Sequence, residues 1–303
     1  MWFKNVTIFQ LAKPFRVSAA SLEDKLSKRS ARKCGPLELS TVGWGSPMPD
    51  GTALTLELDG AILIAAKKQE KILPATVVRE ALNERITEIE VSEQREVKGK
   101  EKKRLRDEIT VEMLPRAFSR SRITYALIDP DNGWLLVDSA SRPRAEELTV
   151  LLRESLGSLE LTNAEGEISP AGIMSQWLFH DKPPAGFTID DECEIRESDE
   201  FGGIIRCKNL DITQGAVRKH LEAQSQVTRL AMSWNDRVSF ILDQDLTIRR
   251  VRPLELIDEL REDELSDDAD ENSELMFISD LMIFHSEISE LITRLLELIK
   301  VTR

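Results

Sequence analysis

Positive charge and one aromatic side chain gather in a short part of this sequence. Residues 95–122 hold ten basic and five acidic side chains, although the whole chain of 303 residues carries a formal charge of −13. The basic residues are Arg95, Lys98, Lys100, Lys102, Lys103, Arg104 and Arg106, followed by Arg116, Arg120 and Arg122 around Phe118. Such clusters bind polyanions by releasing their counterions, and contacts to phosphate carry no sequence information. The alternative is that these basic residues form an exposed turn whose charge only keeps the protein soluble.

Two smaller basic groups lie elsewhere, at Lys67, Lys68 and Lys71 and at Arg206 and Lys208. If residues 120–122 form a strand, the arginines at its two ends share one face, because side chains on a strand alternate. Phe118 has three interpretations: it packs in a core, stacks on a base, or fills a partner's surface.

No motif predicts catalysis. The sequence lacks the glycine-rich loops that bind phosphates, the paired-histidine motif of zinc proteases and the serine elbow of hydrolases. His180, His220 and His285 fall in different elements, and Cys34, Cys193 and Cys207 have no ligand spacing. We therefore predict a protein that is not an enzyme and binds no cofactor or metal. The free thiols and the absence of a leader or a long apolar run predict a cytoplasmic location without membrane attachment.

The acidity is concentrated in one block. Residues 255–274 contain eleven acidic side chains and one basic side chain, so the rest of the chain is close to balanced. The block is either an acidic patch on an outer surface or a solvated loop.

Hairpins without a regular strand–helix alternation predict an α+β fold with antiparallel sheets. Asp59-Gly60 and the DPDNG turn at 129–133 each indicate a hairpin, and residues 18–29 predict a helix with Ser21 as its N-cap. We expect a central domain of residues 1–73 and 116–168 and a base domain of residues 169–303.

Residues 74–115 predict a helical finger inserted in the central domain. Apolar residues recur at helical spacing in two stretches, at Val78, Leu82, Ile86 and Ile89 and at Leu105, Ile109 and Met113. We expect the break at Gly99, which would place the lysines at an exposed tip.

The chain ends in a predicted amphipathic helix at 274–299. Its apolar stripe comprises Phe277, Leu281, Phe284, Ile288, Leu291, Leu295 and Ile299. This stripe packs either in the core or against another subunit.

The order of several segments resembles the RdgC family of bacterial recombination-associated proteins over essentially the whole chain. The matching segments are WFKN, KKQEKILP, LPRAFSR, VDSAS, LLRESLGSL and GGIIRCKNLDIT. The resemblance implies a ring-shaped homodimer with a positively lined hole that admits duplex DNA, little sequence preference, antagonism of RecA recombinase and a place on the nucleoid. The family is not known for enzymes.

The resemblance also implies residue roles. Phe118 matches a position associated with closing the ring. Lys208 matches a basic position, but Asn209 and Leu210 depart from the family's pattern, which puts contacts at those two positions in doubt. We predict contacts to double-stranded DNA, and to single strands if these bind, from Lys67, Lys68, Lys71, Lys98, Lys100, Lys102, Lys103, Arg104, Arg116, Arg120 and Lys208.

Two rival functions remain open at this stage. The first is a DNA-processing enzyme, a nuclease whose carboxylates bind magnesium. The second is a protein-interaction module that binds RecA directly through the acidic block.

Overall fold

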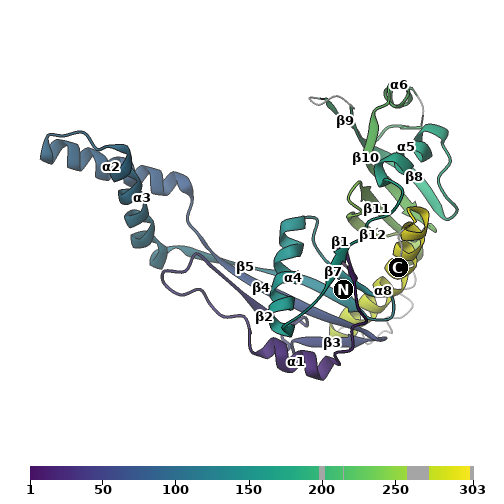
Figure 1. Ribbon diagram of the computed structural model, residues 1–303, viewed down its shortest axis with the longest axis horizontal. Helices are drawn as coiled ribbons and strands as arrows, with labels where there is room; N and C mark the ends of the chain where they lie inside the picture. The colour runs from purple at the N-terminus through teal and green to yellow at the C-terminus, as the bar shows by residue number, and fades with distance from the viewer. Residues whose placement is uncertain (198–201, 214, 258–272, 301–303) are drawn as a thin grey trace.

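The computed structural model describes residues 1–197, 202–213, 215–257 and 273–300, and it shows an α+β protein built on one large antiparallel sheet (Figure 1). The strands are β1 (Asn5–Leu11), β2 (Ser40–Gly45), β3 (Thr55–Leu58), β4 (Ala61–Ile72), β5 (Phe118–Asp129), β6 (Trp134–Val137), β7 (Leu161–Asn163), β8 (Phe187–Arg196), β9 (Ile204–Cys207), β10 (Gln226–Trp234), β11 (Val238–Asp243) and β12 (Ile248–Pro253). Their order is β2-β4-β5-β6-β1-β12-β11-β10-β8-β9, with β3 on β4 and β7 on β1. The expected antiparallel α+β class is confirmed.

The helices are α1 (Ala19–Ser27), α2 (Ala75–Glu93), α3 (Gly99–Met113), α4 (Arg142–Leu156), α5 (Pro170–His180), α6 (Ala216–Glu222) and α8 (Ser273–Leu298), with a 3-10 turn, η1, at Leu114–Arg116. Among the described residues, none of these helices is long and apolar enough to cross a membrane.

Local turn chemistry positions the hairpins as expected. Asp59 (φ 45°) and Gly60 (φ 78°) connect β3 to β4, where Leu58 pairs with Ala61. A two-residue turn with positive φ at both positions matches the twist of the strands that it joins. The second predicted hairpin joins β5 to β6.

Two predicted helix boundaries are wrong. The N-cap of α1 is Ser18, whose hydroxyl accepts the Ser21 N–H at 3.3 Å, so Ser21 lies inside the first turn. Gly99 does not break the finger but begins α3, and the chain instead turns after Gln94, which has a left-handed backbone (φ 53°).

One seam joins the two halves of the sheet. β1 pairs with β6 on one side and with β12 on the other, through Asn5↔Arg249 and Val6↔Ile248. The hydrogen-bonded ladder therefore continues from residues of the expected central domain into residues of the expected base domain.

Each face of this continuous sheet has its own apolar core. On one face Ile62 and Ile64 pack with α1 and α4. On the other face Ala61 and Leu63 share a cluster with β8–β12, α5, α6 and α8. The alternation of side chains along β4 thus assigns even positions to the α4 face and odd positions to the α8 face.

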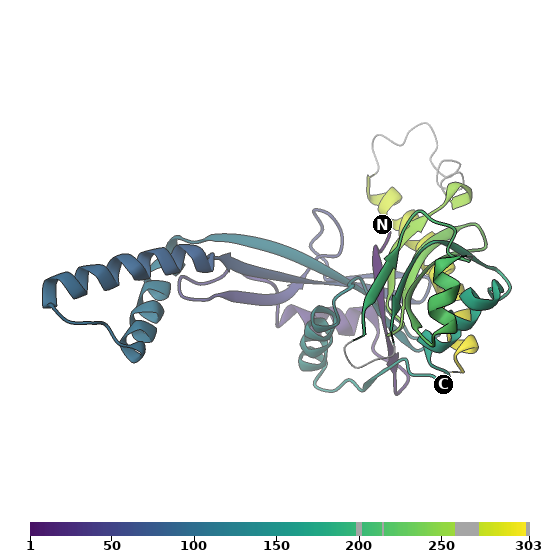
Figure 2. The same ribbon diagram turned by 90° about the horizontal axis from the view of Figure 1, so that it is seen from above.

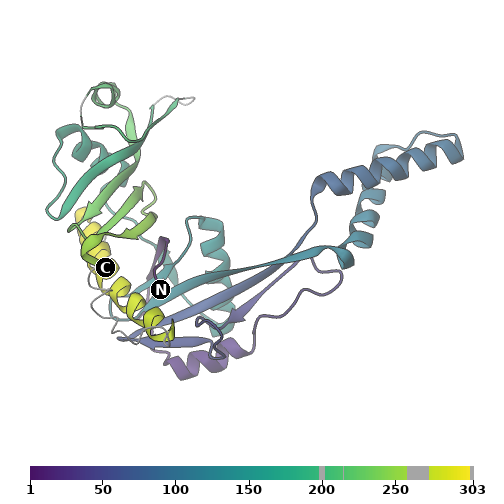
Figure 3. The same ribbon diagram turned by 180° about the vertical axis from the view of Figure 1, so that it is seen from behind.

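The strands β4 and β5 reach far beyond the body of the protein and carry α2 and α3 at their outer ends (Figure 2). The two helices are held together by a small cluster of Ile86, Val97 and Leu105. Seen from either side, the molecule has a bent outline, with α2–α3 at one end and β8–β12 at the other (Figures 1 and 3).

The last helix, α8, belongs to the core. Leu281, Phe284, Ile288, Leu291 and Leu295 are at most 2% exposed. Of the two interpretations of the apolar stripe, packing within the subunit is therefore the one that the structure shows. Most of the acidic block (residues 255–274) falls outside the described residues, and its place on the outer surface stays a prediction.

Truncation of Phe284 should be strongly destabilising. Its ring is 0% exposed and lies 4.8 Å from that of Phe3 and 5.3 Å from that of Trp2, measured between centroids. We expect Phe284→Ala to lower the free energy of unfolding by about 3–5 kcal/mol, measured by urea denaturation. Met282→Ala, at a side chain 40% exposed, is the matched control and should cost less than about 1 kcal/mol. Equal losses in the two variants would contradict the assignment of α8 to the core.

Candidate nucleic-acid interface

One face of β8–β12 carries charged side chains, whereas α5, α6 and α8 cover the other. Cys193, Leu230, Leu242 and Ile248 point into the core beneath those helices. Their neighbours along each strand point the opposite way. The cations on this side, called here the charged face, are Arg196, Arg206, Lys208, Arg229, Arg249, Arg250 and Arg252.

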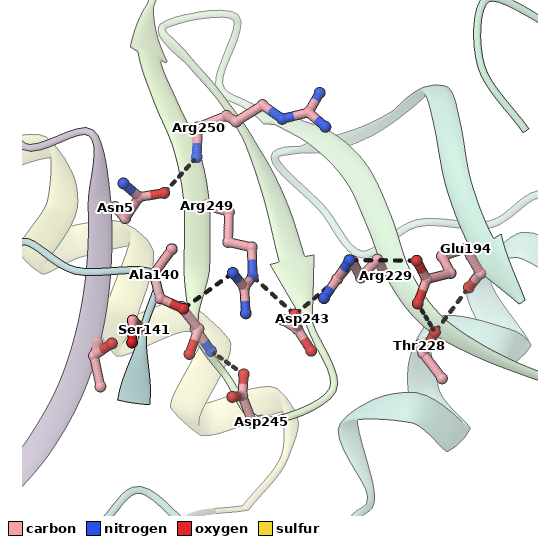
Figure 4. Close-up of polar contacts among 12 residues, drawn as sticks. Asn5, Ala140, Ser141, Glu194, Thr228, Arg229, Asp243, Asp245, Arg249 and Arg250 are labelled. Carbon is pink, nitrogen blue, oxygen red and sulfur yellow. Dashed lines mark hydrogen bonds and ion pairs between the residues drawn. The ribbon is translucent and has the colours of Figure 1, made fainter. Parts of the chain in front are cut away.

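Carboxylates link arginines of the charged face in a row that crosses five strands. Figure 4 shows the part of this row from Glu194 to Arg249. Glu194 of β8 lies 2.7 Å from Arg206 of β9 and 3.3 Å from Arg229 of β10. Asp243 of β11 accepts from Arg229 at 2.9 Å and from Arg249 of β12 at 2.8 Å. Each acid is shared by two guanidinium groups, so the row ends in a cation on both sides.

A second row uses Glu192. Its carboxylate lies 3.3 Å from Lys208 and 2.8 Å from Arg250. Arg250 has a left-handed backbone (φ 51°) at an irregularity in the β11–β12 pairing. Such a bulge re-aims side chains, and here it lets consecutive Arg249 and Arg250 both reach carboxylates of the charged face.

The cations of the charged face outnumber its acids. Seven basic side chains stand against Asp190, Glu192, Glu194 and Asp243. The side chains of Arg206 and Arg250 are 63% and 50% exposed. Because an arginine has five N–H donors, those not used by the carboxylates remain available to an anion in solvent.

The acids of the charged face hold these arginines in place as anions. Burial is the largest single influence on the pKa of Glu194 and raises it, but the hydrogen bond from Arg206 and the charges of Arg229 and Arg206 together bring that pKa below its ordinary value. The pKa of Glu192 is lowered in the same way, against burial, by Arg250 and Lys208. Both carboxylates are therefore ionised at neutral pH and orient their partners.

The distal part of β4 and β5 continues this face of the sheet. Directly opposite residues of antiparallel strands share a face, and Glu70↔Arg120 and Lys68↔Arg122 are such pairs. Their face is the α4 face, which the Asn5↔Arg249 pair continues into the charged face. The expectation that the two arginines of β5 share one face is confirmed.

The three lysines of β4 do not form one cluster. Lys68 lies on the α4 face and makes an ion pair with Glu147 of α4 at 2.6 Å. Lys67 and Lys71 lie on the opposite face, and Lys71 donates to the Ala117 carbonyl at 3.4 Å. Lys67 and Lys68 are adjacent in sequence but lie on opposite faces of the sheet, because successive side chains of a strand point to opposite sides.

The remaining predicted contacts differ in how far they are already paired. Arg104 lies 3.4 Å from Glu108, and Arg120 forms an ion pair with Glu70. Six of the predicted contacts are exposed and have no ion pair within the described part of the chain: Lys67, Lys98, Lys100, Lys102, Lys103 and Arg116. The lysines at and after residue 98 stand at the start of α3, at the outer end of the molecule (Figure 2).

Phe118 is 85% exposed at the start of β5, opposite Ile72. The interpretation of this ring as part of the subunit's core is therefore wrong, and the two that involve another molecule remain.

The sequence reasoning missed five arginines of the charged face: Arg196, Arg229, Arg249, Arg250 and Arg252. Each was visible as a basic residue in an alternating strand, and IRRVRP at 248–253 holds three of them. Nothing in the sequence showed that β10 and β12 would lie in one sheet with β9. Among the described residues, no group of three or more His, Cys, Asp or Glu side chains is arranged to hold a metal ion.

Comparison with known proteins identifies relatives over most of the chain. Residues 1–302 match a family described as "RdgC: Putative exonuclease, RdgC". The chain is 40% identical over 272 residues to the recombination-associated protein RdgC of Pseudomonas aeruginosa PAO1, which covers 89% of each chain. It is 41% identical over 269 residues to the protein of that name from Tolumonas auensis, covering 88% of this chain and 89% of the relative. With the Pseudomonas entomophila protein of that name it shares 39% identity over 286 residues, or 94% of each chain.

Acid should weaken the fold partly through Glu194. Its folded-state pKa lies below that of an unfolded glutamate, so its contribution is complete above the unfolded pKa of about 4.3 and is lost as pH falls through the lower folded value. We expect Glu194→Gln to be less stable than the wild type at pH 7 and to lose less stability between about pH 5 and pH 3. Urea denaturation at a series of pH values measures both.

Glu84→Gln on the exposed side of α2 provides the control and should follow the wild-type profile. A Glu194→Gln profile parallel to that of the wild type would show that its arginine contacts do not stabilise the fold.

Proposed function

This chain belongs to the RdgC family, and we propose that it binds duplex DNA without sequence preference, as a homodimer that encloses the DNA and limits access of RecA recombinase to it. The observation that carries the proposal is the charged face, whose exposed arginines are held in two carboxylate-linked rows across β8–β12. A role in recombination is in keeping with the names of the relatives.

The charged face suits phosphate better than bases. Neighbouring strands are about 4.8 Å apart, so an arginine on every second strand presents guanidinium groups at regular intervals over an area rather than at one point. Arginine binds phosphate oxygens through its fork of N–H donors, and such contacts fix position without reading sequence. Since Arg206, Arg229, Arg249 and Arg250 are each already oriented by a carboxylate, binding orders few new side-chain rotamers at these four arginines.

The shape of the subunit supports enclosure. In Figure 1, α5 and α8 lie on the outer side of the bend, so the charged face looks across the concave side toward the end that carries α2 and α3. The exposed lysines at the start of α3 stand at that far end. A second copy placed opposite would complete a cationic surface around a duplex, and the acidity of the remaining surface would disfavour DNA elsewhere.

Phe118 is the proposed contact that closes the dimer. A phenylalanine with 85% of its surface exposed is costly in water, and burying it against a partner recovers that free energy. Ile72 beside it is 45% exposed and extends the apolar patch.

A nuclease is the second candidate, because the description of the matched family contains the words "Putative exonuclease". Glu192, Glu194 and Asp243 are engaged by arginine or lysine at 2.7–3.3 Å, which leaves them poor magnesium ligands. The binding experiment below separates the two functions if it is run with and without magnesium and the DNA is checked for cleavage. Intact DNA favours a binding protein, and RecA binding without DNA would favour a protein-interaction module.

Removal of two outer arginines tests the charged face. The double variant carries Arg206→Gln and Arg250→Gln. In it Glu194 keeps Arg229 as a partner and Glu192 keeps Lys208, so the protein should still fold. We expect affinity for duplex DNA of any sequence to fall about tenfold at low salt, and the slope of log affinity against log salt to become shallower by about 2. Fluorescence anisotropy at several salt concentrations measures both quantities.

The control is Lys182→Gln with Lys219→Gln, which removes two exposed cations on the side of α5 and α6. It should leave both quantities nearly unchanged. If the two double variants behave alike, the charged face is not where DNA binds.

Phe118→Ser tests closure of the dimer. Because the ring is exposed in the subunit, the substitution should change its stability by less than about 0.5 kcal/mol. We expect a weaker dimer in sedimentation experiments and faster loss of closed circular DNA in high salt, since an open ring cannot retain it. Val150→Ser, at another exposed apolar side chain (46%), should preserve both. A Phe118→Ser protein that stays dimeric and retains circular DNA would show that the Phe118 side chain does not close the dimer.

A further inference from the structure

Two of the three cysteines face each other across neighbouring strands. Cys193 of β8 and Cys207 of β9 are register partners, and both are free thiols. Cys193 is 2% exposed, whereas Cys207 is only partly buried at the edge of the same apolar cluster. Both lie on the α8 face, behind the charged face. Cys34 is remote from them, beside Gln69 of β4, whose carbonyl accepts its thiol hydrogen at 3.1 Å.

The strand pairing brings these two thiols within disulfide range. The Glu197 N–H donates to the Gly203 carbonyl at 3.1 Å, and hydrogen-bonded pairs recur at every second residue. Cys193 and Cys207 thus occupy such a pair, with Cα atoms about 5.5 Å apart. Disulfides usually span about 4.4–6.8 Å between Cα atoms. β9 ends the order of paired strands and pairs with β8 alone in the described sheet, so it can adjust by the small distance that a bond requires.

We propose that Cys193 and Cys207 form a reversible modification site that reacts with a hydroperoxide and closes to an intrachain disulfide. The site does not rest on the DNA-binding function, because it needs only the register of β8 and β9.

The exposures of the two thiols set the order of the steps. The Cys207 sulfur attacks one peroxide oxygen, so that an S–O bond forms, the O–O bond breaks and hydrogen peroxide releases one water. The Cys193 sulfur then attacks the Cys207 sulfenic acid and loses its proton. An S–S bond forms, the S–O bond breaks and a second water leaves. Two thiols lose two electrons and two protons, and the peroxide is reduced to two waters.

The environment of Cys193 agrees with its place as the second thiol. Burial, followed by the neighbouring Cys207, raises the pKa of the Cys193 thiol to about 12. A buried thiol that keeps its proton is a poor first nucleophile toward a solute, but it needs no access to solvent to attack a neighbouring sulfur.

The bond would fasten an edge strand of the sheet. Arg206 directly precedes Cys207, and it pairs with Glu194 on the charged face. A disulfide on the α8 face therefore fixes the backbone that positions this arginine. Closing the loop between residues 193 and 207 should also raise the melting temperature by roughly 5 °C.

The full-length protein treated with hydrogen peroxide tests the proposal. After the remaining thiols are alkylated, the protein is digested without reductant and analysed by mass spectrometry. We expect a peptide that joins Cys193 to Cys207, lighter by two hydrogen atoms and separated by dithiothreitol, together with the higher melting temperature.

Two variants provide the controls. Cys34→Ser should form the same linked peptide at the same rate. Cys207→Ser changes the partly exposed thiol, so it should fold, and it should leave Cys193 open to alkylation after unfolding. Peroxide treatment that yields Cys207 sulfinic acid, or thiols at both positions that still alkylate while Cys34 is oxidised, would overturn the proposal.

Discussion

The pairing of β1 with β12 is the interaction on which the rest of this structure depends. It joins the two halves of the chain into one sheet and thereby makes two continuous faces, one on the side of α4 and one on the side of α8. Since side chains alternate along the strands except at the bulges, this register decides that the arginines of β8–β12 and those of β5 emerge on the same face. A shift by one residue at the seam would place the charged row against α8.

Local features of the fold were predictable from the sequence, and long-range ones were not. The Asp59-Gly60 turn and the apolar stripe of the last helix are encoded within a few residues, and the structure shows both. The misplaced cap of α1 and the early start of α3 are errors of a few residues at helix ends, where several residues compete as caps. The charged face was missed because its residues are assembled from five separate strands. The converse applies to Lys67, Lys68 and Lys71. They were expected to form one cluster because they are close in sequence, but Lys68 lies on one face of the sheet and the other two lie on the opposite face.

An acidic protein with a cationic face raises the question of how so many arginines coexist. Here Glu192, Glu194 and Asp243 each pair with two cations, so these acids reduce repulsion among the basic side chains without neutralising the surface. This arrangement also limits desolvation, because Arg206 and Arg250 keep about half or more of their side-chain surface in water. Glu194 and Asp243 are nearly buried, so their net effect on stability depends on good geometry with both partners.

The length of β4 and β5 has a mechanical consequence. With twelve residues in β4 at about 3.3 Å each, the paired strands form a lever of about 40 Å that begins close to the seam. A tilt of about 10° at its root would displace the far end by about 7 Å. The apolar cluster that spans Leu63, β10–β12 and α8 braces that root from behind. How stiffly this brace resists bending therefore sets the spread of positions that the far end can sample.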